Sequence, residues 1–149
     1  MPTAENVELL VEMADQIRAA LDDVTDIAVQ VEPLMVLNPT PPCIDMWPGD
    51  IARDQPTAAF NDDGGFNFTI RARVSTADSV AGQALLLAFM DDINALSVGQ
   101  ALYDDPTLNG LASDLSIVAQ TGYELAPDLG GDGALLSCRW QILVLRADS

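Results

Sequence analysis

The run from Ala84 to Met90 constrains the fold of this chain more than any other segment. Its seven residues, ALLLAFM, are all apolar. The surrounding pattern predicts a helix from about Asp78 to Leu96, with Thr76 as its N-cap. Seven residues make nearly two turns, so apolar side chains cover every side of this helix. A sheet covers one side, and we expect the first helix of the chain or a neighbouring subunit to cover the other.

The segment Phe66–Val74 predicts a strand with one buried face. Five apolar residues alternate with four polar ones along it, and two of the polar ones are Arg71 and Arg73. Alternation of this kind is typical of a strand with one face on the core and one face in water. We therefore expect Arg71 and Arg73 to stand together on a solvated face.

The rest of the chain predicts one α+β domain over residues 1–149. Apolar residues at helical spacing from Val7 to Leu21 predict an opening helix. A mostly antiparallel sheet of about four to five strands is expected, backed by two main helices. The remaining expected elements are strands at Ile27–Leu37, Cys43–Trp47, Leu115–Leu125 and Leu135–Arg146, a short helical turn from Ser97, and a long acidic loop at about 48–64.

The absence of histidine and lysine, together with the net charge, excludes several classes of function. The chain has 23 acidic residues, six arginines, no lysine and no histidine, which gives a net charge of −17. Catalytic arrangements that need histidine or lysine, and zinc sites built on histidine, are therefore impossible. The acidity also disfavours binding to phosphate backbones and to anionic membranes. A metal-dependent hydrolase using carboxylates alone survives this test, but few positive charges are present to hold its substrate.

Adjacent acids are better explained by turns than by catalysis. Asp62-Asp63 and Asp91-Asp92 fall in an expected loop and at an expected helix end, where aspartate often shapes the backbone. Cys43 and Cys138 lie far apart in the sequence and predict two structural thiols, although a disulfide between them stays open. We expect no enzymatic activity, no metal and no cofactor.

Targeting and membrane segments are not expected either. The first ten residues carry acids where a signal peptide has basic residues. Uncharged runs are too short to span a bilayer. The expectation is a soluble protein, cytosolic at synthesis.

The order and spacing of the expected elements resemble the tail terminator (tail-completion) proteins of long-tailed bacteriophages, a group that includes lambda-type terminators and related neck components. The similarity runs over nearly the whole chain. It is carried by the opening helix leading into Ile27–Leu37, by PPCIDMWP at Pro41–Pro48 with the loop after it, by FTIRARVST at Phe68–Thr76 leading into Ala81–Leu96, and by SVGQALYDDPTLNG at Ser97–Gly110.

This resemblance implies a non-enzymatic virion protein. It implies a homohexameric ring on the head-proximal end of the tail tube that ends tube growth and joins the tail to the head connector. The implied partners are copies of the chain, the tail tube protein and a head–tail connector or neck protein. Genomic DNA would pass through the lumen without sequence-specific binding, and no membrane is involved. The implied location is the neck and tail of the virion, with assembly in the host cytoplasm.

Ten residues are candidates for a subunit or partner interface. Two alternatives remain for the function: another head–tail connector or neck ring component, and a non-viral acidic adaptor module that binds a partner protein along its apolar helix. The candidate interface residues are Trp47, Asp62, Asp63, Arg71, Arg73, Leu86, Leu87, Met90, Asp91 and Asp92.

Overall fold

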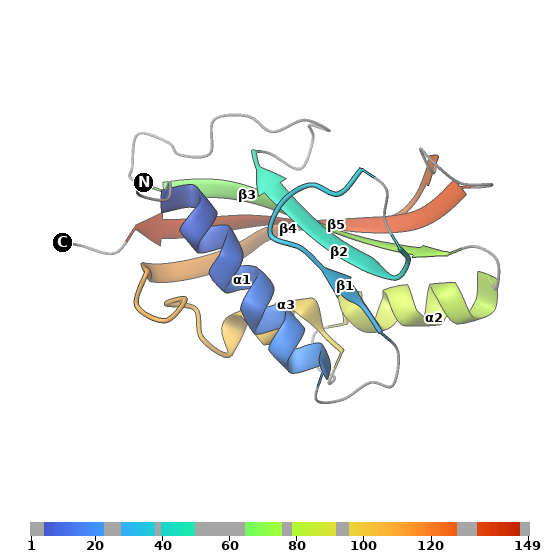
Figure 1. Cartoon of the computed structure of the whole chain (residues 1–149), viewed down its shortest axis with the longest axis horizontal. Helices are drawn as coiled ribbons and strands as arrows, with labels where there is room; N and C mark the ends of the chain where they lie inside the picture. The colour runs from blue at the N-terminus through green and yellow to red at the C-terminus, as the bar shows by residue number, and fades with distance from the viewer. Residues whose placement is uncertain are drawn as a thin grey trace.

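The computed structural model has an α+β fold built from one five-stranded sheet and three helices (Figure 1). It describes residues 5–22, 28–37, 40–49, 65–75, 79–91, 96–127 and 134–146. The predicted fold class is therefore confirmed. The elements are α1 (Glu5–Asp22), β1 (Gln30–Val31), β2 (Cys43–Pro48), β3 (Gly65–Ser75), α2 (Ser79–Met90), α3 (Val98–Tyr103), β4 (Ala112–Pro127) and β5 (Ala134–Arg146).

The sheet has the strand order β1-β2-β3-β5-β4. Every neighbouring pair is antiparallel except β1 and β2, which run parallel. The predicted strand at Ile27–Leu37 is wrong in its length, because among its described residues, 28–37, only Gln30 and Val31 pair with β2. Proline cannot donate to a sheet ladder, and Pro33 follows this short strand directly. The chain leaves the sheet there and returns to it at Cys43.

One face of the sheet, the inner face, packs against the helices. Met46, Ile70 and Trp140 lie in register across β2, β3 and β5, and all three are buried. They belong to one apolar cluster that also takes side chains from α1, α2 and α3. Figure 1 shows the three helices gathered on one side of the strands. Trp140 is thus a core residue, as its place in an alternating strand indicates.

The opposite face, the outer face, is more covered than the sequence predicts. Thr69 and Arg73 are buried on it, and Arg71 is half-buried. The expectation of a solvated face is therefore wrong at these positions. Residues 32–37, here named the strap, account for part of the cover, because Arg73 donates a hydrogen bond to the carbonyl of Val36.

Helix α2 lies close to the sheet at Gly82. A Cβ atom built on this glycine would stand 2.5 Å from the carbonyl oxygen of Ser75, at the end of β3. Only glycine allows that approach of two backbones. The glycine thus determines which side of α2 meets the sheet, and with it which side is left uncovered.

Candidate functional site

Asp45 forms the centre of a buried ion cluster on the outer face. It lies directly opposite Arg71 in the β2–β3 register, and its side chain is fully buried. Arg71 donates from Nε to Oδ1 at 3.1 Å and from Nη2 to Oδ2 at 2.7 Å. Arg73 donates from Nη2 to Oδ2 at 3.1 Å. One carboxylate therefore holds two guanidinium groups: Arg71 in the paired geometry that arginine and carboxylate favour, and Arg73 through a single hydrogen bond.

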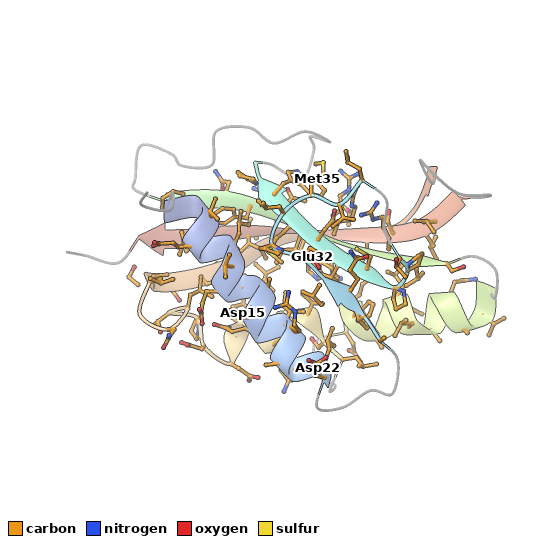
Figure 2. All side chains as sticks on the ribbon, viewed as in Figure 1. Asp15, Asp22, Glu32 and Met35 are labelled. Atoms are coloured by element: carbon orange, nitrogen blue, oxygen red, sulfur yellow. The ribbon has the colours of Figure 1, made fainter. Side chains whose placement is uncertain are left out.

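The same carboxylate fixes the strap to the sheet. The backbone N–H of Val36 donates to Asp45 Oδ2 at 2.9 Å, and Arg73 Nη2 donates to the Val36 carbonyl at 2.8 Å. Figure 2 shows Glu32 and Met35 on this strap, which loops past β2. Two leucines of the strap stay in contact with solvent, Leu34 at 52% and Leu37 at 62% exposure. The ion cluster thus holds exposed apolar side chains in a defined position.

Trp47 lies beside the ion cluster and beneath two arginines. The guanidinium carbon of Arg71 is 4.8 Å from the centroid of its ring, and that of Arg139 is 5.7 Å from it. Both distances are within the range of a cation–π interaction. Arg71 and Arg139 also face each other in the β3–β5 register. Three of the six arginines of the chain therefore lie on one sheet face, and two of them, Arg71 and Arg139, stack on one tryptophan.

Trp47, Arg71 and Arg73 were expected as interface residues from the sequence, whereas Asp45 and Arg139 were not. The signal for Asp45 is present, because alternation along Cys43–Trp47 places Cys43, Asp45 and Trp47 on one face. A single acid in an otherwise apolar strand indicates a buried charge with a partner. Arg139 offers no such signal, because its contact with Trp47 crosses three strands.

Burial shifts the pKa of two groups at this site. Desolvation lowers the pKa of the Arg73 guanidinium, and the charge of Asp45 opposes that change. Desolvation also raises the pKa of the Cys43 thiol from its ordinary value of 9.0 to about 11, and the negative charge of Asp45 adds to the effect. Cys43 is therefore a protonated, unreactive thiol at neutral pH.

The shifted thiol predicts a loss of stability at high pH. The folded state holds the Cys43 proton more tightly than the unfolded state, so this contribution is complete below pH 9 and is lost as pH rises toward 11. We expect Cys43 to account for a drop of about 1 kcal/mol in the free energy of unfolding by pH 10. Urea denaturation from pH 8 to 11 measures it, with Cys43→Ala as the comparison. An identical pH dependence in both proteins would contradict the assignment.

The two cysteines do not form a disulfide. Both are free and buried. Cys43 pairs with Arg73 on the outer face, whereas Cys138 pairs with Ala72, whose side chain is part of the inner core. The alternative of two structural thiols is the one that the structure supports.

Helix α2 is uncharged and mostly apolar, with the exposed Gln83 on its outward side, and the fold covers only part of it. Leu86 and Phe89 are fully buried, so Leu86 is a core residue and not a surface candidate. Met90 is half-buried near Gly122 of β4. Val80, Ala84 and Leu87 share the outward side, here named the α2 face; Val80 is 77% exposed and Leu87 is 53% exposed. No residue of α2 carries a charge.

A hollow of about 470 Å³ lies beside the end of α2. Its walls come from the end of α2, from α3, from the edge strand β4 and from Trp140 of β5. Tyr103 is half-exposed at this hollow, and its hydroxyl accepts a hydrogen bond from the backbone N–H of Ile117 at 2.8 Å. The exposed Asp91 also lies at its rim, so this candidate residue is near the α2 face.

Three candidate residues, Asp62, Asp63 and Asp92, fall outside the described residues, as does most of the loop at 48–64. In the described ranges, histidine, cysteine and carboxylate side chains do not form groups of three or more that would hold a metal ion. The described helices lack the combination of length and hydropathy needed to cross a bilayer.

No protein-family model fits the chain, and no curated protein matches its sequence.

Proposed function

We propose that this chain is a structural virion protein, a tail terminator that forms a ring at the head-proximal end of a phage tail tube. In this role it ends growth of the tube and joins the tail to the head connector, and DNA passes through its lumen. The partners are copies of the chain, the tail tube protein and a neck protein. The six-fold ring and the phage context come from the family resemblance alone.

The observation that carries the proposal is the α2 face. A chain with net charge −17 repels its own copies, because like charges oppose close approach. The α2 face combines exposed apolar side chains with a helix that itself carries no charge, and the exposed Asp91 follows at the end of that helix. It is therefore a place where two copies gain apolar burial at little electrostatic cost. This combination favours a second copy as the occupant over a charged ligand.

A second candidate function is an adaptor module that binds another protein. The hollow beside Tyr103 favours it, because exposed aromatic side chains at the rim of a concave surface are typical of protein-binding sites. An adaptor would be captured with one stoichiometric cellular partner and without virion proteins. That result would replace the terminator proposal.

Electron microscopy of particles made without this protein tests the terminator role. We expect over-long tails, or tails without heads, because nothing stops the tube or joins it to the connector. Expression of the unmodified chain in trans is expected to restore normal particles. Tails of normal length with attached heads, made in the absence of the protein, would overturn the proposal.

A further inference from the structure

The most exposed apolar side chains of this chain form two separate patches. Within the described ranges, the four most exposed large apolar residues are Val80 and Leu87 on the α2 face and Leu34 and Leu37 on the strap. Helix α2 has no charged residue, and residues 33–37 of the strap, PLMVL, have none either. In a chain of net charge −17, these are two surfaces where another acidic copy meets little repulsion.

The two patches lie on opposite faces of the sheet. Helix α2 packs on the inner face, where Leu86 and Phe89 are part of the apolar core. The strap is bonded to the outer face through Val36, whose N–H donates to Asp45 and whose carbonyl accepts from Arg73. The sheet therefore separates the patches, and neither covers the other within one copy.

Two different patches on opposite faces suit a head-to-tail contact between copies. A contact of the α2 face with itself is a two-fold contact, which stops at two copies and leaves the strap uncovered. A contact between the α2 face of one copy and the strap of the next leaves a free patch at each end, so it repeats until a ring closes. The ring of the proposed function needs a contact of this second kind.

The two patches also match in length and are both held in place. Val80 and Leu87 are seven residues apart on a helix, about 10 Å along its axis, with the small Ala84 between them. Leu34 and Leu37 are three residues apart and so lie at most about 10 Å from each other along the chain. Two hydrogen bonds to the ion cluster fix the strap before contact, so less backbone freedom is lost when its leucines are buried.

We propose that the strap of one copy packs on the α2 face of the next copy, so that Leu34 and Leu37 cover this face. The inference rests on the proposed function and deepens it by naming the surface that covers the α2 face. A second copy is the occupant that the patches favour, because each patch complements the other in hydropathy, lack of charge and length. One repeated contact of this kind buries both exposed apolar patches.

Thiol cross-linking of the assembled full-length chain tests this contact. The native Cys43 and Cys138 are buried, so a short bismaleimide reacts with introduced surface cysteines. We expect the double variant Leu34→Cys with Leu87→Cys to be linked into a ladder of multimers, and each single variant to give only background. In the matched control, Val118→Cys on β4 replaces Leu34→Cys, because Val118 is nearly as exposed as Leu34. This control pair is expected to give only background.

The double variant Leu34→Gln with Leu37→Gln supplies a second measurement. Glutamine is neutral, so the repulsion between copies does not change, and both leucines are exposed, so the fold loses little. We expect self-association to weaken at least about a hundredfold in sedimentation velocity, because two apolar side chains are lost from the contact.

Four outcomes would overturn this inference. A ladder no stronger than that of the Val118→Cys control would exclude the contact, and cross-linked dimers from Leu87→Cys alone would replace it with a two-fold contact between α2 faces. Normal assembly of the Leu34→Gln, Leu37→Gln variant would also exclude it. In these three cases an unmodified chain that assembles leaves the proposed function standing. An unmodified chain that stays monomeric removes the proposed function, and the inference with it.

Discussion

Asp45→Asn is expected to lower the free energy of unfolding by about 3–5 kcal/mol, the usual cost of removing one partner from a buried ion cluster. The substitution keeps the shape of the side chain but leaves Arg71 and Arg73 without a counter-charge. It also weakens the acceptor for the N–H of Val36, so the strap loses one of its two attachments to the cluster. Guanidinium chloride denaturation measures the change.

Asp15→Asn is the matched control for that experiment. Asp15 pairs with Arg18 at 2.8 Å on the exposed side of α1, where it is visible in Figure 2. Exposed pairs of this kind contribute less than about 1 kcal/mol. A double-mutant cycle between Asp45→Asn and Arg73→Met is expected to show strong coupling, because removing both charges is less costly than removing one. Equal, small effects at Asp45 and Asp15 would contradict the account of the ion cluster.

Replacing Val80 and Leu87 together by glutamine is expected to abolish self-association at concentrations where the unmodified chain assembles. Both side chains are exposed in the single copy, so the fold loses little. Each side chain contributes about 1.5–3 kcal/mol when it goes from fully exposed to fully buried, which corresponds to a loss of affinity of about tenfold to about a hundredfold for each side chain removed. Sedimentation velocity measures the result. Glutamine is neutral, so the repulsion between copies does not change.

Val11→Gln is the control for the α2 variant. Val11 is also an exposed aliphatic residue, but it lies on α1. We expect this variant to assemble like the unmodified chain. If the α2 variant also assembles normally, the α2 face is not the contact between copies.

Local periodicity predicts much of this fold. The alternation of Phe66–Val74 predicts β3, and the same pattern predicts β5 with Trp140 inside the core. An apolar run without a polar side predicts a helix, but not which side of it meets the sheet. Positions 86 and 87 are both leucine, yet Leu86 is fully buried and Leu87 is half-exposed. The glycine at position 82 decides between them, because the backbone of α2 approaches β3 there.

The candidate site is harder to predict because the residues that pair with one another in it are distant in the sequence. Arg71 and Arg73 were expected in water, since alternation says only that a face is polar. Their shared partner, Asp45, lies on another strand, and the strap that covers Arg73 is a connection between β1 and β2. Burial of a polar face depends on where such a connection runs. Pro33 indicates that a strand ends, but not that the chain then crosses the sheet.

We propose that copies of this chain cover the α2 face of one another, and the proposed function depends on this self-assembly. Native mass spectrometry of the unmodified chain, repeated over a range of concentration and salt, tests it most directly. We expect one closed assembly of six copies, favoured by added salt because salt screens the repulsion between acidic copies. A chain that remains monomeric at every concentration and every salt level would contradict it.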